Sequence, residues 1–152
     1  MIDPNQDGIS HINIYSQGKT DLGRMLSNFY RYNIIIKDGL FYSVEAYWHW
    51  LGLKECEEKQ NYRFTYGYNA KKLGTELKTK HGTQFVDDFE NKILYAIWYK
   101  VKKNSHLFKP ELNYLPFEHY YNFGGNIRDA KSKYLWMIDS ITKMRDIIIS
   151  NK

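Results

Sequence analysis

The stretch SVEAYWHW, residues 43–50, sets the organisation of the chain around it. Ser43 is a favourable N-cap residue, and the pattern after it predicts a helix over about residues 44–53. In that helix Glu45 and His49 lie one turn apart on one face, among aromatic and apolar residues. A carboxylate in such surroundings is costly to keep ionised without a partner. Glu45 is therefore the first candidate for a chemically active group.

Residues around this helix predict a small sheet near the N-terminus. A strand over about residues 32–36 is followed by Lys37-Asp38-Gly39, and an Asp-Gly pair is a strong signal for a tight hairpin into residues 40–42. An earlier strand is expected over residues 12–15. Three remaining segments of this half are expected to be irregular: a turn-rich or flexible lead-in over 1–11, a flexible loop over 21–29 and a surface segment over 54–63. A short helix is expected over 70–74, where Asn69 caps its start and Gly74 stops it.

Two longer helices are predicted in the second half, each with a charged residue inside its apolar stripe. The first spans about residues 84–103 and has Lys100 near the centre of the stripe. The second spans about residues 130–149 and has Arg145 in the same position relative to its apolar residues. Lys100 allows three interpretations. It is a desolvated amine whose depressed pKa suits a nucleophile, a positive partner that holds Glu45 ionised, or a snorkelling side chain whose ammonium reaches water.

The composition indicates one α+β domain, predominantly helical with a small N-terminal sheet, that spans residues 1–152. A chain of 152 residues with 43% hydrophobic content can bury one core, whereas two domains would each be marginal. Aromatic residues make up 17% of the chain, and such rings line binding sites as well as cores. The net charge of +5 permits a phosphate-bearing partner without requiring one.

The sequence also predicts where the protein works. Cys56 is the single cysteine, and the N-terminus lacks the pattern of an export signal, so we expect a protein of the reducing cytoplasm. No segment approaches the roughly 20 continuous apolar residues that span a bilayer, so no membrane association is expected. The histidines are too dispersed in sequence to propose a metal site, and we expect neither a metal nor a cofactor.

Several short motifs follow one another along the chain in a characteristic order. They are Tyr15-Ser16 after a strand, Leu26-Ser27-Asn28-Phe29-Tyr30, Ser43-Val44-Glu45-Ala46-Tyr47-Trp48, Ala70-Lys71-Lys72-Leu73-Gly74 and Ala96-Ile97-Trp98-Tyr99-Lys100. In this order, and together with an inward Arg145, they resemble the NADAR or YbiA-like family over residues 12–145.

The resemblance implies a YbiA-like α+β fold and an N-glycosidase that hydrolyses a ribose C1–nitrogen bond. The implied substrate is ADP-ribose attached to guanine in nucleic acid, whose removal reverses DNA ADP-ribosylation in antitoxin or phage counter-defence systems. The basic charge favours this substrate over a free metabolite. Two alternatives remain, namely an N-glycosidase acting on a riboflavin-pathway ribosyl-amine intermediate and a non-catalytic ADP-ribose or NAD-binding protein.

The same resemblance assigns roles to individual residues. The family's catalytic glutamate corresponds to Glu45 and a catalytic lysine to Lys100. Two family residues are replaced, a lysine seven positions after the glutamate by Gly52 and a tryptophan by Phe85. The alternative for Glu45 is a buried salt bridge with Lys100 or Arg145. The candidate ligand-binding residues are Ser27, Asn28, Phe29, Trp48, His49, Phe85, Tyr121, Asn126, Asp129 and Arg145.

Overall fold

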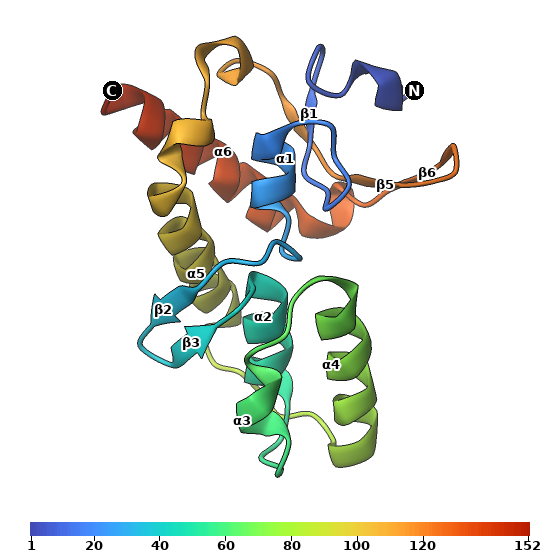
Figure 1. The fold of residues 1–152 in the computed structure, drawn as a ribbon, viewed down its shortest axis with the longest axis vertical. Helices are drawn as coiled ribbons and strands as arrows, with labels where there is room; N and C mark the ends of the chain where they lie inside the picture. The colour runs from blue at the N-terminus through green and yellow to red at the C-terminus, as the bar shows by residue number, and fades with distance from the viewer. The chain divides into compact units, whose positions relative to one another are not determined.

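A computed structural model describes all of residues 1–152 (Figure 1). Helices account for 51% of the chain and strands for 14%, which agrees with the predicted α+β, predominantly helical class. The chain forms two compact units, one of Asn28–Lys100 and one of Met1–Ser27 with Val101–Lys152. The prediction of a single domain over residues 1–152 stays a prediction. None of the helices has the length and apolar character that crossing a bilayer requires.

The unit of Asn28–Lys100 contains one β-hairpin and the helices that carry Glu45 and Lys100. Its elements are β2 (Ile34–Ile36), β3 (Gly39–Phe41), α2 (Val44–Gly52), α3 (Lys59–Tyr62), α4 (Gly67–His81) and, up to Lys100, α5 (Phe89–Lys103).

The predicted hairpin is confirmed. Strands β2 and β3 pair antiparallel, with Ile34 opposite Phe41 and Ile36 opposite Gly39. Gly39 has a φ of +124°, a backbone conformation that residues with a side chain rarely adopt. The Asp-Gly pair at the turn therefore has a direct conformational reason.

The predicted start of helix α2 is also confirmed. The Ser43 hydroxyl oxygen accepts a hydrogen bond from the Ala46 N–H at 3.0 Å, and the hydroxyl donates to the Thr65 carbonyl at 3.0 Å. Ser43 thus satisfies one of the helix's free N–H groups and ties the helix start to the residues that precede α4. The helix ends at Gly52, one residue before the predicted end.

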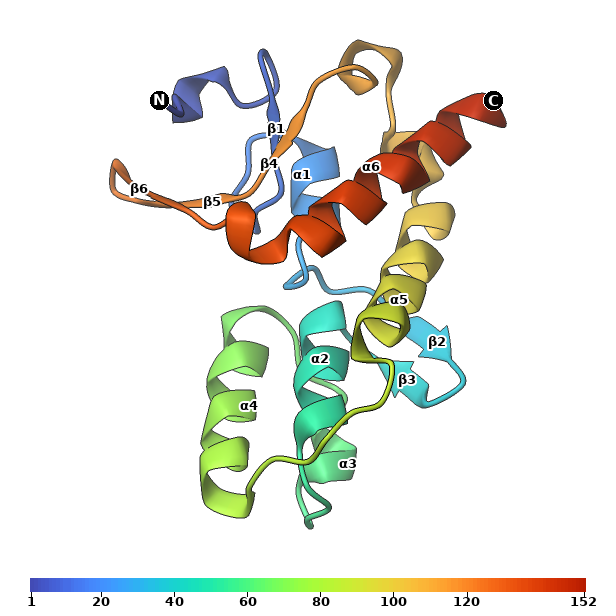
Figure 2. The same ribbon diagram turned by 180° about the vertical axis from the view of Figure 1, so that it is seen from behind.

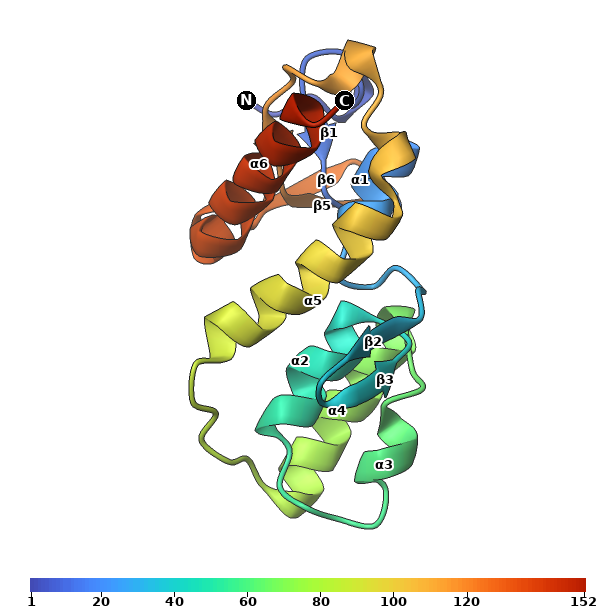
Figure 3. The ribbon, with the colours of Figure 1, turned by 90° about the vertical axis from the view of Figure 1, so that its left-hand side faces the viewer.

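Helix α4 corrects the prediction of a short helix stopped by Gly74. The helix continues through Gly74 to His81, and a β-carbon at Gly74 would stand 2.5 Å from the Tyr62 hydroxyl and 2.6 Å from Cγ of His49. Gly74 is therefore required for close packing and does not end the helix. His49 faces Gly74 while Gly52 faces Lys78, so α2 and α4 run side by side in the same direction (Figure 1). In the view of Figure 3, α4 lies behind α2.

The prediction that residues 54–63 lie at the surface is wrong in part. The end of this segment forms α3, in which Lys59 and Tyr62 are buried. Tyr62 packs with Ala46, Leu53 and Leu77 in a small core cluster. Lys59 is buried as well, and its ammonium donates to the Leu53 carbonyl at 2.6 Å.

The second unit combines short strands with two α-helices and several short 3-10 turns (Figure 2). Its elements are η1 (Pro4–Gln6), β1 (Ile12–Asn13), α1 (Asp21–Leu26), η2 (Ser105–Leu107), η3 (Pro110–Leu112), β4 (Phe117–Glu118), β5 (Tyr120–Phe123), β6 (Asn126–Asp129), η4 (Ser132–Tyr134) and α6 (Leu135–Ser150).

Pairing in this unit differs from the prediction of a small sheet made only of N-terminal residues. Strand β1 pairs in parallel with β4, more than a hundred residues later, with Ile12 opposite Phe117. The glycine-containing segment before α6 forms a second hairpin, β5 with β6, in which Gly124 and Gly125 have positive φ.

One further segment of this unit is more regular than predicted, and another agrees with its prediction. The segment expected as a flexible loop over 21–29 begins with helix α1, whose N-cap Thr20 accepts from the Gly23 N–H at 2.8 Å. The lead-in over 1–11 is turn-rich as predicted, and the Asp7 carboxylate anchors it by accepting from the Asn13 N–H at 2.9 Å and the Lys19 N–H at 2.8 Å.

Candidate functional site

Glu45 lies in the first turn of α2, with its carboxylate largely enclosed. The side chain is 13% exposed, and Oε2 lies 3.0 Å from Nε2 of His49, one turn further along the helix. The Glu45 N–H donates to the Asn28 carbonyl at 2.9 Å. The positive end of the helix dipole favours a carboxylate at this position. Glu45 and His49 therefore share one face of the helix, as predicted, and their side chains are in direct contact.

Helix α4 covers this face of α2 and closes the site on one side. Gly74 packs directly on the ring of His49, as described above, and Tyr62 lies beside them. Burial, and after it the negative charge of Glu45, raises the pKa of the Tyr62 hydroxyl. The Tyr62 hydroxyl donates to the Ala70 carbonyl, which fixes the ring against α4. The carboxylate thus lies in a packed environment and not on an open surface.

Lys78 is a functional candidate that the sequence interpretation missed. Its Nζ lies 3.5 Å from the point where a β-carbon at Gly52 would stand, so the absence of a side chain at Gly52 makes room for it. Burial lowers the pKa of the Lys78 ammonium, and the negative charge of Glu45 opposes that shift. Lys78 therefore supplies positive charge to the Glu45 face from α4, at the level of Gly52.

The sequence contained a signal for Lys78. Small and apolar residues recur at helical spacing as Ala70, Gly74 and Leu77, and all three are buried. Lys78 comes directly after Leu77 and one helical turn after Gly74, so the same spacing places it next to the buried stripe. Gly74 hides this signal, because a glycine at that position also predicts the end of a helix, one turn before Lys78.

Lys100 is fully buried, so the snorkelling interpretation is wrong and the predicted inward position is confirmed. Burial lowers the pKa of its ammonium to about 7. Its Nζ lies 5.9 Å from the centre of the Tyr30 ring, within the range of a cation–π contact. At neutral pH a substantial fraction of Lys100 is therefore the neutral amine.

The short segment 28–30 connects these elements. The Asn28 carbonyl accepts from the Glu45 N–H, and the Phe29 carbonyl accepts from the Gly67 N–H at 3.0 Å, at the start of α4. The next residue, Tyr30, provides the ring beneath the Lys100 ammonium. The segment thus contacts the starts of α2 and α4 and the lysine of α5. That Glu45 and Lys100 line one cavity stays a prediction.

Two of the aromatic candidates of this unit, Trp48 and Phe85, lie in different surroundings. The Trp48 ring packs edge-on against Phe89 with centroids 4.9 Å apart. Phe85, by contrast, is 88% exposed in the segment before α5. The ligand-binding roles assigned to both stay predictions, and Phe85 has no protein ring to hold it in place.

The remaining candidates belong to the other unit. Ser27 is the buried C-cap of α1. Tyr121 lies in β5, where its ring packs edge-on against Tyr15 at 5.8 Å between centroids. Asn126 and Asp129 are exposed at the two ends of β6. Their roles in ligand binding stay predictions.

Arg145 is buried, as the apolar stripe predicted. Its Nη1 donates to the Leu115 carbonyl at 2.6 Å and to the Leu112 carbonyl at 3.3 Å. The guanidinium lies 4.2 Å from the centre of the Phe117 ring. These contacts hold residues 112–117 against α6, and a role for Arg145 toward a ligand stays a prediction.

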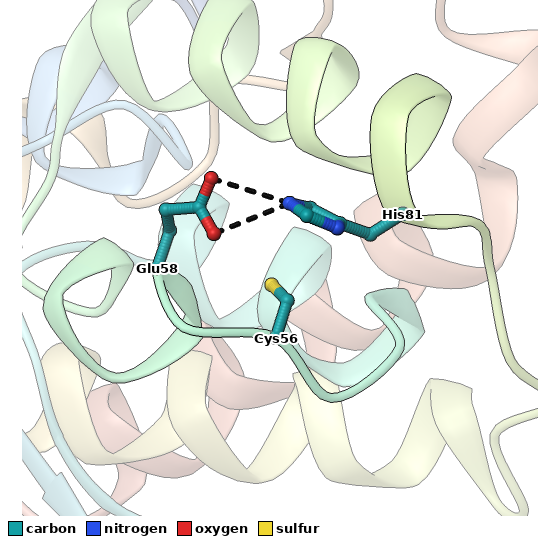
Figure 4. Close-up of side chains that lie close together, drawn as sticks. All are labelled: Cys56, Glu58 and His81. Atoms are coloured by element: carbon teal, nitrogen blue, oxygen red, sulfur yellow. Dashed lines mark hydrogen bonds and ion pairs between the residues drawn. The ribbon is translucent and has the colours of Figure 1, made fainter.

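A second group of reactive side chains lies at the other end of α4 (Figure 4). Cys56, Glu58 and His81 offer a thiol, a carboxylate and an imidazole whose ligand atoms all lie within 4.8 Å of one another. Spacing along the sequence gave no signal for this group, because His81 comes from the end of a helix that was predicted to stop earlier.

Comparison of the chain with protein-family models, with curated proteins and with solved structures finds no match. The family resemblance therefore depends on the quoted motifs alone. What the site offers chemically is an enclosed carboxylate paired with an imidazole, a nearby half-buried ammonium, and a separate buried amine.

Proposed function

We propose that the protein is an N-glycosidase that removes ADP-ribose from guanine in nucleic acid, with Glu45 as its central catalytic residue. The observation that carries this proposal is the enclosed carboxylate of Glu45, held at 3.0 Å by His49 in the first turn of α2. In the reaction, the bond between ribose C1 and the base nitrogen breaks as positive charge develops on the sugar. A fixed carboxylate stabilises that charge and accepts a proton from the attacking water.

His49 and Lys78 support Glu45 in this mechanism. His49 holds the carboxylate in one orientation through the Nε2 contact. Lys78 contributes a cation that interacts favourably with the Glu45 carboxylate. Its position beside Gly52 lets α4 supply positive charge close to the residue that replaces the resembled family's lysine on the glutamate's own helix. The replacement by Gly52 is therefore compatible with catalysis.

Lys100 supplies a buried amine to the same mechanism. Burial lowers its pKa to about 7, which makes the amine available as a nucleophile near neutral pH. We therefore assign Lys100 the role of nucleophile, and its role as the counter-ion of Glu45 is the alternative. The amine attacks ribose C1 as the bond from C1 to the base nitrogen breaks, and the proton that the amine loses goes to the leaving base. The C1–O4 bond of the ribose ring then opens, O4 takes a proton from solvent, and the sugar is held on Lys100 as a Schiff base. Glu45 accepts a proton from the water that attacks this Schiff base, which releases ADP-ribose and the original lysine.

Exposed aromatic and basic residues favour a nucleic-acid substrate over a free metabolite. The Arg31 guanidinium lies 4.2 Å from the centre of the Tyr42 ring and 5.5 Å from that of Tyr66. Tyr66 is 49% exposed and directly precedes Gly67, whose N–H is bonded to Phe29. Stacked rings with an arginine bind the bases and backbone of single strands without strong sequence preference.

Two substrates and one binding ligand test this proposal against its alternatives. The protein is incubated with a guanine-ADP-ribosylated oligonucleotide and, separately, with the riboflavin-pathway ribosyl-amine intermediate, and products are identified by mass spectrometry. Binding of ADP-ribose is measured by calorimetry. We expect release of ADP-ribose from the oligonucleotide, and borohydride added during turnover should trap the sugar on Lys100. Cleavage of the metabolite alone would support the metabolic enzyme, and micromolar binding without any cleavage would support the non-catalytic binder.

A further inference from the structure

We propose that Cys56, Glu58 and His81 bind one transition-metal ion of the zinc class. The thiol sulfur, the carboxylate oxygens and the imidazole nitrogen lie within 4.8 Å of one another. Figure 4 shows the Cys56 sulfur and the His81 ring turned toward the Glu58 carboxylate. Thiolate, imidazole and carboxylate are the three side-chain ligands that zinc uses in proteins.

The distances suit a tetrahedral ion. His81 Nε2 lies 3.2 Å from the Glu58 carboxylate. Two ligands each about 2.1 Å from one tetrahedral ion stand roughly 3.4 Å apart. The oxygen and nitrogen therefore need almost no movement, and a sulfur within 4.8 Å reaches its own bond length of about 2.3 Å by a rotamer adjustment of Cys56. Three protein ligands leave the fourth position to water.

The backbone on both sides of the group is already fixed. Leu53 forms an antiparallel bridge with Thr83, and the Lys54 N–H donates to the Gly82 carbonyl at 3.2 Å. These bonds hold the segment that carries Cys56 against the end of α4 that carries His81. A metal ion would complete this attachment with little ordering cost, because the two segments are in place before it binds.

The alternative is an ordinary ion pair. Glu58 also accepts from Lys80 Nζ at 3.3 Å, and that lysine is 67% exposed. A metal ion must compete with this ammonium for the same carboxylate. The competition gives the two interpretations opposite predictions for the removal of Lys80, since an ion pair loses a partner whereas a metal site loses a competitor.

Cobalt(II) is the probe for the test, because thiolate coordination gives an intense near-ultraviolet charge-transfer band. Full-length protein is freed of metal with a chelator under reducing conditions and titrated with Co²⁺ and then Zn²⁺. We expect the band to saturate at one Co²⁺ per chain and to disappear when Zn²⁺ is added. The band should be absent in Cys56→Ser, and affinity should fall at least about tenfold in His81→Gln and Glu58→Gln.

Two variants separate a built site from adventitious binding. Lys80→Ala should tighten Co²⁺ binding severalfold, whereas the exposed His106→Gln should leave it unchanged. Circular dichroism confirms that each variant is folded. Absence of the charge-transfer band in the wild-type protein, or a band of equal affinity in His81→Gln, would overturn the proposal. Because the readout is metal binding and not glycosidase activity, the result is independent of the function proposed above.

Discussion

Lys78 places its ammonium 3.5 Å from the point where a β-carbon at Gly52 would stand, and thereby fills the space above that glycine on α2. The neighbouring contact in the same helix pair is much tighter, with Gly74 pressed against His49 and Tyr62. The two glycines of this interface therefore serve different purposes. One makes room for a flexible charged side chain, and the other permits close approach of two helices.

Alanine substitution should distinguish these two glycines. A β-carbon at Gly74 would overlap Cγ of His49 at 2.6 Å, so Gly74→Ala should lower the free energy of unfolding by about 1–3 kcal/mol. A β-carbon at Gly52 would stand 3.4 Å from Lys78 Cε, which is an ordinary contact. Gly52→Ala should therefore raise the free energy of unfolding by about 0.4–1 kcal/mol. Urea unfolding measures both. Equal stability of the two variants would contradict this packing of α2 on α4.

Removal of the Lys78 charge should lower activity without unfolding the protein. Lys78→Met keeps the apolar stem over Gly52 but removes the cation that interacts with the Glu45 carboxylate. We expect kcat/KM on the ADP-ribosylated oligonucleotide to fall about tenfold, which corresponds to about 1.4 kcal/mol. Lys37→Gln, at an exposed lysine of the hairpin turn, is the control and should retain wild-type activity. Full activity of Lys78→Met would show that α4 does not contribute charge to the site.

Burial of Lys100 should make stability depend on pH. Its pKa is about 7 in the folded protein and 10.5 as the ordinary value, so between these pH values the unfolded chain binds a proton that the folded chain does not. The free energy of unfolding therefore gains from this residue as pH rises, by up to about 1.4 kcal/mol per pH unit. Below pH 7 both states are protonated and the folded state bears the full cost of the buried charge.

Denaturation curves from pH 6 to 10 test this dependence. Lys100→Met should lose the contribution of Lys100 to the slope and should gain stability relative to wild type most strongly at pH 6. Lys102→Met, two residues along at an exposed position of α5, should keep the wild-type slope. Identical slopes in wild type and Lys100→Met would mean that the amine is charged and solvated in the folded protein.

Exposed aromatic residues should contribute to nucleic-acid binding. Tyr66→Ala should weaken binding of a single-stranded oligonucleotide by about 1–3 kcal/mol, the usual loss for one stacked base. Arg31→Ala should reduce the slope of log affinity against log salt by about 0.7. Tyr114→Ala, at a tyrosine that is 89% exposed, serves as control. If Tyr66→Ala and Tyr114→Ala bound equally well, nucleic acid would not use this surface.

Local signals predicted the parts of the fold that depend on neighbouring residues. The Asp-Gly turn fixed the hairpin because Gly39 alone tolerates the required φ. Ser43 marked the start of α2, and the apolar stripe of α5 placed Lys100 inside. Each of these features is decided within a few turns of chain, and for that reason the sequence was sufficient.

Features that depend on distant contacts could not be predicted in this way. Gly74 looked like a helix stop, and only its contact with His49 explains a glycine inside α4. The parallel pairing of Ile12 with Phe117 joins segments that have no local signal for each other. The group of Cys56, Glu58 and His81 likewise forms only when the loop before α3 meets the end of α4.

Glu45→Gln is the most direct test of the catalytic role proposed here. The substitution keeps the size of the side chain and a hydrogen bond to His49 but removes the negative charge and the proton acceptor. Glu90→Gln is the matched control, because Glu90 also lies in the first turn of a helix but is exposed. The measurement is kcat/KM for release of ADP-ribose from guanine-ADP-ribosylated oligonucleotide. We expect a loss of at least about 100-fold in Glu45→Gln and none in Glu90→Gln. Unchanged cleavage by Glu45→Gln would contradict the mechanism.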